Sequence, residues 1–191
     1  MADKPEEWST QLSYLVLGIV SLHSAVHTTR VNRGAAAGFL LQALAAAAAL
    51  VSGPQPDTNN QMATWVATVI GLPLLAFDFH WVNGDCSTAN LLLGAGMVLA
   101  IAGDFLDTET QAVAGQAVAL VAAVTILIVS VFTVNTYGVG GGMALGAASL
   151  MSRLEEETLL FFQKEDACRW ALALGSWAYR WALHTQHLEL D

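Results

Sequence analysis

Long stretches without a charged residue alternate with short polar or charged segments along the chain, and this pattern predicts membrane-spanning helices. A helix needs about 20 apolar residues to cross about 30 Å of hydrocarbon. The apolar runs are continuous and not alternating, which favours helices over barrel strands, the other structure that satisfies its own backbone in lipid. We therefore predict an all-α fold, a polytopic helical membrane bundle of about six spans, covering residues 12–29, 34–52, 62–80, 88–103, 112–134 and 137–152.

The longest uncharged stretch, from Thr110 to Ser152, predicts two helices instead of one. A single helix of that length would measure about 64 Å, roughly twice the hydrocarbon thickness. The polar cluster Asn135–Gly138 tolerates a turn and is the expected break. In the third span, Pro73 follows Gly71 and predicts a bend.

The chain changes character after residue 152, which divides it into a bundle, residues 1–152, and a tail, residues 153–191. The tail begins with an acidic segment around Glu155–Glu157, and a helical pattern resumes from Lys164. This helix carries a tryptophan-rich face beside a stripe formed by Arg169, Ser176, Arg180 and His187. The pattern is typical of an amphipathic helix among lipid headgroups. The alternative is a seventh span whose arginine stripe faces the bundle.

Six spans place both ends of the chain on one side of the membrane. Arg30 and Arg33 then lie opposite the other five of the seven Lys and Arg residues. The positive-inside rule makes the side with five the cytoplasm, although the rule alone prefers an odd number of spans, which divides the charges six to one. We expect six spans, with both ends cytoplasmic.

Composition supports the membrane interpretation. Hydrophobic residues make up 55% of the chain and charged residues only 12%, about half the share in soluble domains. The net charge of −9 leaves no basic surface for nucleic acid. The lipid bilayer is therefore the expected partner, together with a membrane-protein partner or a second copy of the chain. Spans rich in Gly and Ala slightly favour a thinner internal membrane.

Four ionisable residues within or beside the spans are candidate metal ligands: His23, His27, Asp78 and His80. The two histidines of the first span are four apart and share one helix face, while Asp78 and His80 lie at the end of the third. Imidazole and carboxylate groups suit zinc, and ionisable groups inside a membrane are functional candidates by default. The competing interpretation is that these side chains bond neighbouring helices or lie at the membrane surface, which leaves the protein without a cofactor.

Glycine spacing indicates helix packing. Gly138, Gly142 and Gly146 recur every fourth residue of the sixth span, and such faces let helix backbones approach closely. Packing within one bundle is the favoured interpretation, and a dimer face is the alternative. No catalytic residue is predicted, because the nucleophile, zinc-hydrolase and phosphate-loop motifs do not occur. Cys86 and Cys168 are either palmitoylation sites or inert small residues.

Several segments resemble a family of small vertebrate multi-pass proteins. The longest is Trp65 to Asp85, and shorter ones are Trp8–Thr10, Leu15–His23, Ser152–Glu156 and Cys168–Leu172. Together they cover much of the chain and resemble the transmembrane protein 276 family. The resemblance implies a membrane location and provides no active-site residues.

Three functions stay open. The leading hypothesis is a non-catalytic assembly, trafficking or accessory component, because packing signals outnumber chemical ones. The rival is an intramembrane metal-dependent lipid hydrolase similar to the alkaline ceramidase superfamily, which would use zinc. That family carries a His-x-x-x-His pair in a late helix, whereas the late pair here, His184 and His187, is three apart. A small channel or carrier is the third hypothesis, although few polar groups lie deep in the spans.

Overall fold

The computed structural model describes residues 4–53, 58–152, 158–159 and 162–190, nearly all of them helical. The helices are α1 (Lys4–Thr28), α2 (Arg33–Ser52), α3 (Thr58–Val66), the π-helical η1 (Ala67–Gly71), α4 (Leu72–Val82), α5 (Cys86–Ala102), the 3₁₀ turn η2 (Gly103–Phe105), α6 (Thr108–Phe132), α7 (Thr136–Met151) and α8 (Lys164–Leu190). Strands β1 (Thr158–Leu159) and β2 (Phe162–Gln163) form a short antiparallel pair before α8. The predicted all-α class is confirmed.

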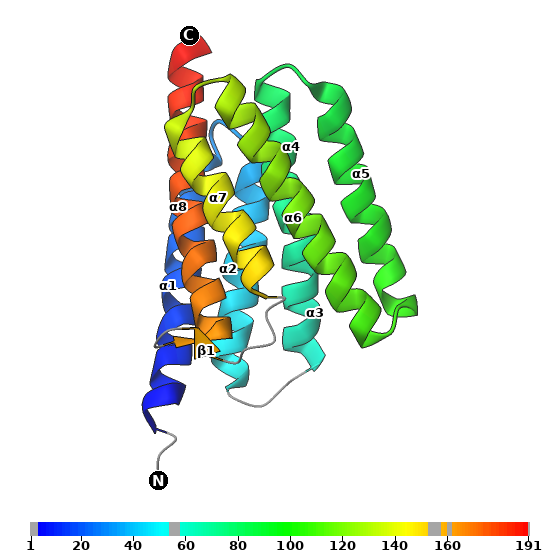
Figure 1. The fold of residues 1–191 in the computed structure, drawn as a ribbon, viewed down its shortest axis with the longest axis vertical. Helices are drawn as coiled ribbons and strands as arrows, with labels where there is room; N and C mark the ends of the chain where they lie inside the picture. The colour runs from blue at the N-terminus through cyan, green and yellow to red at the C-terminus, as the bar shows by residue number, and fades with distance from the viewer. Residues whose placement is uncertain (1–3, 54–57, 153–157, 160–161, 191) are drawn as a thin grey trace.

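The helices run up and down along one common direction (Figure 1). Because α3, η1 and α4 follow one another as one segment, the described chain runs along the bundle seven times. α1 packs between α2 and α8, and α7 packs between α6 and α8. α4 contacts α2, α5 and α6, whereas α5 lies at the edge, mainly against α4 and η1.

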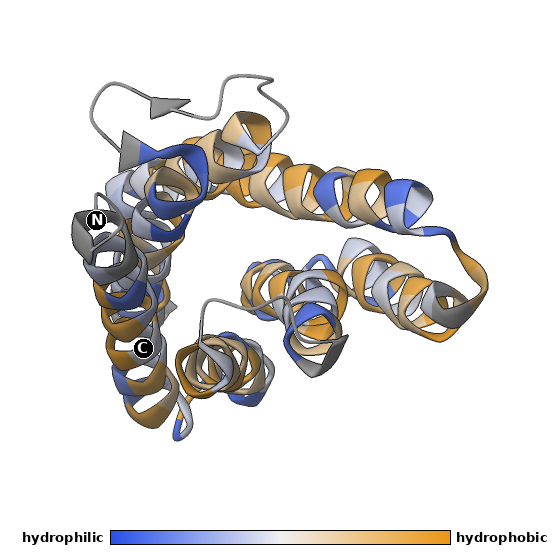
Figure 2. Cartoon of the chain, turned by 90° about the horizontal axis from the view of Figure 1, so that it is seen from below, coloured by the Kyte–Doolittle hydropathy of each residue, from blue (hydrophilic) through white to orange (hydrophobic). Residues whose placement is uncertain are grey.

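The packing places small residues inside and large apolar residues outside. Most of the buried apolar residues are alanines, and the interior also holds Ser21, Ser130 and Ser176. Large side chains such as Ile101, Val131 and Leu174 are exposed. Viewed along the bundle, the hydrophobic colour is not confined to the inner sides of the helices (Figure 2). A soluble protein does not expose this much contiguous apolar surface, so the bundle is of the membrane type.

Helix boundaries follow from caps that the sequence contains. Asn135 accepts a hydrogen bond from the backbone N–H of Gly138 at 2.9 Å and begins α7. The long uncharged run is therefore broken at the predicted cluster. Asp85 and Asp107 cap α5 and α6 in the same way. Each cap satisfies one of the backbone donors that a helix start leaves unpaired.

The third span is irregular at the predicted place. The π-helical η1 directly precedes α4, whose second residue is Pro73, and proline cannot donate the backbone bond that a regular helix requires there. Neighbouring helices approach this segment through glycines. A Cβ on Gly38 of α2 would lie 2.5 Å from the Gly71 carbonyl oxygen, and a Cβ on Gly96 of α5 would overlap the Val69 carbonyl.

The candidate spans of the described chain bear on the expected number of six. Four segments are long and apolar enough to cross a membrane, Trp8–Thr28, Arg33–Ser52, Asn60–Val82 and Thr108–Phe132, and α5 is a shorter apolar helix. The count of six is therefore not confirmed. The start of α1 and the end of α8 also lie at opposite ends of the bundle, not together as expected (Figure 1).

The end of the described chain lies opposite its start because of the position of α8. It runs alongside α1 and α7 for much of its length, and Arg169 and Ser176 of its polar stripe are buried against the bundle. This placement agrees with the alternative in which the stripe faces the bundle, and it disagrees with a helix lying flat among headgroups. The physical reason is that small residues of α8, including Gly175 and Ser176, allow close packing that the tryptophan pattern does not reveal. The acidic segment at 153–157 lies outside the described residues.

The seven-pass arrangement predicts that the two ends of the chain lie on opposite sides of the membrane. Protease added to sealed vesicles should remove an epitope tag from one end only, and both tags after detergent is added. Immunoblotting of N-terminally and C-terminally tagged chains measures this. Loss of both tags, or of neither, from sealed vesicles would support an even number of passes instead.

Candidate functional site

The candidate metal ligands are separated in the structure. His23 and His27 form an exposed pair on α1, with ring centroids 4.4 Å apart. His80 is buried on α4, and its Nδ1 lies 3.4 Å from a carboxylate oxygen of Asp85 without hydrogen-bond geometry. Among the residues that the structure describes, no three His, Cys, Asp or Glu side chains lie together as a metal ion requires. The four candidates therefore do not assemble into one site.

Asp78 instead caps a neighbouring helix. Its carboxylate accepts hydrogen bonds from the backbone N–H groups of Gly34 and Ala35, at the start of α2. A helix start presents unpaired N–H groups and a partial positive charge, which a carboxylate satisfies. Gly34 makes room for it, because a Cβ there would lie 2.7 Å from Asp78 Oδ1. This acid thus joins α4 to α2.

The capping role predicts the effect of removing this carboxylate. Asp78→Ala should destabilise the detergent-solubilised protein by about 1 kcal/mol, the usual loss for a helix cap. For a chain of this length the midpoint of thermal unfolding should fall by about 2–4 °C. A chelator should leave the midpoint of the wild type unchanged. If the chelator alone lowers that midpoint as much as the substitution, Asp78 holds a metal ion.

The predicted glycine face of α7 lies against α6. A Cβ on Gly142 would lie 3.1 Å from the backbone nitrogen of Leu127, and one on Gly138 would overlap the Ser130 hydroxyl. At Gly146 the nearest atom is the Cβ of Ala123, at an ordinary 3.8 Å. The three glycines therefore contact a helix of the same chain, which agrees with packing inside one bundle.

Two glycines of α7 provide a matched test of this contact. Gly142→Ile should force α6 and α7 apart and cost about 1–3 kcal/mol, the usual range for overpacking. Gly140→Ile is the control, because no atom lies within 4 Å of a Cβ at that position. Both variants change helix propensity equally. Thermal unfolding in detergent should separate them, and equal midpoints would show that the glycine contact does not matter.

A cavity of about 640 Å³ lies between the helices, toward the end of the bundle at which α1 begins. It was not predicted from the sequence. Most of its wall surface is apolar, and ten of the 19 residues that line it carry uncharged polar side chains, namely Tyr14, Asn60, Gln61, Thr64, Thr68, Thr108, Gln111, Gln116, Ser149 and Ser152. The rest of the wall consists of Trp65, Leu72, Ala112, Gly115, Ala119, Ala148, Glu165, Cys168 and Leu172.

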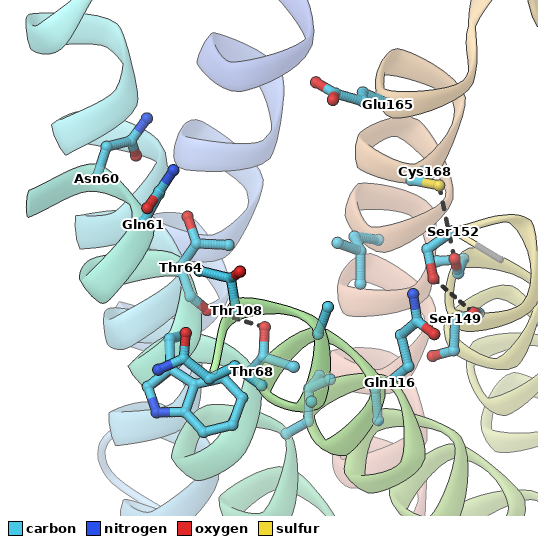
Figure 3. Close-up of a pocket in the computed structure, with 18 of the residues that line it drawn as sticks. Asn60, Gln61, Thr64, Thr68, Thr108, Gln116, Ser149, Ser152, Glu165 and Cys168 are labelled. Carbon is cyan, nitrogen blue, oxygen red and sulfur yellow. Dashed lines mark hydrogen bonds between the residues drawn. The ribbon is translucent and has the colours of Figure 1, made fainter. Parts of the chain in front are cut away.

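The polar groups face one another across this cavity. Asn60, Gln61 and Thr64 of α3 lie on one side, and Ser149, Ser152 and Glu165 lie on the other (Figure 3). Some of these groups are used within their own helices. Thr68 donates to the Thr64 carbonyl, and Ser152 donates to the Ser149 carbonyl. The carbonyl oxygen of the Asn60 side chain is buried and has no hydrogen-bond partner.

A buried ion pair supports the wall formed by α1 and α8. Asp166 is fully buried, pairs with Arg169 and accepts hydrogen bonds from Ser9 and Ser13 of α1. The guanidinium of Arg169 also lies 4.1 Å from the ring centroid of Tyr14, which lines the cavity. These contacts fix the two helices relative to each other.

The mouth of the cavity is acidic. Asp107 caps α6 next to the lining residue Thr108, and the hydroxyl and backbone N–H of Thr110 donate to its carboxylate. These bonds hold the pKa of Asp107 below its usual range, so this carboxylate is charged at neutral pH. Glu165 is also at the mouth, 3.5 Å from Arg169.

Sequence reasoning missed the cavity because its lining comes from six helices and η1. One signal was present. Asn60, Thr64 and Thr68 recur every fourth residue, which places a polar stripe on one face of an otherwise apolar segment. A polar stripe in a membrane helix faces protein or a water-filled space. The spacing could therefore have identified one wall, although not the opposite one.

Comparisons with known proteins found full-length relatives. The chain is 69% identical to "Transmembrane protein 276" of Bos taurus, over 97% of this chain and 96% of the relative. It is 67% identical to the protein of the same name from Homo sapiens and 66% identical to that from Mus musculus, in both cases over the whole of each chain. No family model matches, and no solved structure matches. Together with the apolar helices, these names establish a membrane protein, and its organelle stays a prediction.

Proposed function

The chain belongs to the transmembrane protein 276 family, and from this premise we propose that it is a non-catalytic accessory component of the membrane that binds a ligand. The observation that carries the proposal is the cavity lined by amides and hydroxyls. Its volume of about 640 Å³ lies within the range of about 300–1,000 Å³ that small-molecule sites occupy. Its wall combines apolar surface with a few convergent polar groups, as such sites do.

The lining supports binding rather than reaction. Among the described residues, no histidine, lysine or arginine lines the cavity, and the carboxylate of the described lining, Glu165, is paired with Arg169. Ser149 donates its hydroxyl to the Leu145 carbonyl. Nucleophilic catalysis needs a nucleophile within hydrogen-bond reach of a base. The lipid-hydrolase alternative also needs several metal ligands in one place, and among the described residues no three His, Cys, Asp or Glu side chains form such a group.

The packing of the bundle supports a channel less than it supports a binding cavity. Beyond the cavity, the interior of the bundle holds an aromatic cluster in which Phe39 and Phe79 each contact Tyr179. All three are fully buried. This cluster belongs to the main hydrophobic core, which joins α1, α2, α4, α5, α6, α7 and α8. A permeation route would have to pass through it.

A substitution that fills the cavity with a larger side chain should prevent ligand binding. Ala112 lines the cavity and its side chain is exposed there, so Ala112→Phe should occupy the space without overlapping the core. The matched control is Val113→Phe, at an exposed neighbouring position outside the lining. Proteins purified in mild detergent should be extracted and their bound small molecules measured by mass spectrometry.

We expect one class of molecule at close to one per chain in the wild type and in Val113→Phe, and at least fivefold less in Ala112→Phe. Its mass should stay unchanged during incubation with the protein. Equal amounts in the two variants would contradict the binding site. Formation of a cleaved product that requires the protein would contradict the non-catalytic role.

A further inference from the structure

Resting on the binding function just proposed, we propose that the cavity takes an uncharged single-chain amphiphile, with a hydroxyl- or amide-bearing head at the mouth and its hydrocarbon chain directed inward. A monoacylglycerol represents this class. Three properties of the lining carry the inference: its charge, its hydrogen-bonding groups and the position of its apolar surface.

The charges of the described lining disfavour an anionic head. Among the residues that the structure describes, no lysine or arginine lines the cavity, so a phosphate or carboxylate would have no counter-charge on this part of its wall. Glu165, the charged residue of the described lining, has a largely exposed side chain and pairs with Arg169 outside the lining. Asp107 and Glu109 add negative charge near the mouth. An anion there would be repelled. A cation would be attracted to these carboxylates, but on the described lining itself it would meet only Glu165, which is already paired with Arg169.

The polar groups match a head that both donates and accepts hydrogen bonds. Side-chain amides and hydroxyls do both, whereas carboxylates only accept and ammonium groups only donate. Asn60 lines the cavity and its side-chain oxygen is a buried acceptor without a partner, so rotation of this side chain would present the oxygen to a ligand O–H or N–H. Burying an unpaired polar atom costs free energy that such a donor would recover.

Three apolar residues of the lining lie deeper than much of its polar part. Leu72 follows the polar residues of α3 and η1, Ala119 those of α6 and Leu172 those of α8, toward the middle of the bundle, where the hydrophobic core begins. Leu72 and Ala119 are themselves members of that core. A hydrocarbon chain placed there is removed from water, at about 0.8 kcal/mol per buried methylene.

Photolabelling distinguishes the ligand classes. A diazirine- and alkyne-bearing monoacylglycerol would be irradiated with the full-length protein purified in detergent. Competitors of equal chain length would be an unlabelled monoacylglycerol, a lysophosphatidic acid and a primary alkylamine. We expect the monoacylglycerol to compete at a concentration at least tenfold lower than the other two. Labelled peptides should come from residues 58–72 and 108–119.

Two pairs of variants locate the labelling. Ala112→Phe should lower it at least fivefold and Val113→Phe should not. Asn60→Leu should weaken competition by the monoacylglycerol about two- to tenfold, the effect of one hydrogen bond. Met62→Leu is its control, because Met62 is exposed and lies outside the lining.

Each outcome decides between the two proposals. If lysophosphatidic acid or the amine competes better, and the labelling still depends on Ala112, the ligand class is wrong and the binding function stands. If labelling is absent, or is equal in Ala112→Phe and Val113→Phe, the neutral-amphiphile inference fails. If the molecules bound during purification are then also equal in the two variants, the binding function fails with it.

Discussion

Close approach between helix backbones is the constraint on which this bundle depends. In a bilayer, apolar side chains gain little by leaving lipid for protein, so helices associate through packing and interhelical hydrogen bonds. The centre of this packing is the irregular segment around Pro73. Gly38 and Gly96 let α2 and α5 lie against its carbonyls, and an added Cβ at either position would overlap backbone. The same principle joins α7 to α6 at Gly142.

Polar contacts then set which helices are neighbours. The side-chain oxygen of Gln42 on α2 accepts from Ser21 of α1 at 3.4 Å and from Ser176 of α8 at 3.0 Å, so one amide connects three helices. Asn135 donates to the Ala182 carbonyl at 2.9 Å and joins the start of α7 to α8. These bonds account for the place of α8 inside the bundle, since a helix at the membrane surface could not make them.

The elements could be predicted from the sequence because they depend on local properties. Uncharged length indicated the helices, and Asn135 and Pro73 marked a break and an irregularity that the structure contains. The partners of individual side chains could not be predicted in this way. Asp78 looks the same in sequence whether it binds a metal or caps α2, and only the fold brings Gly34 beside it. The arginine stripe of α8 likewise suits either headgroups or a protein interior.

The cavity results from the same small residues that close the rest of the bundle. Where large side chains meet, as at Phe39 and Tyr179, the space between helices is filled. Toward the end at which α1 begins, the helices present small lining residues such as Ala112 and Ala148, which leave space between them. Several hydroxyls and amides of its wall are paired within the protein, as Ser149, Ser152 and Gln111 are with backbone carbonyls, whereas the side-chain oxygen of Asn60 is unpaired. Polar groups at this depth are costly against lipid tails, so the proposed polar head, attached to a hydrocarbon chain, fits a wall that combines them with apolar residues.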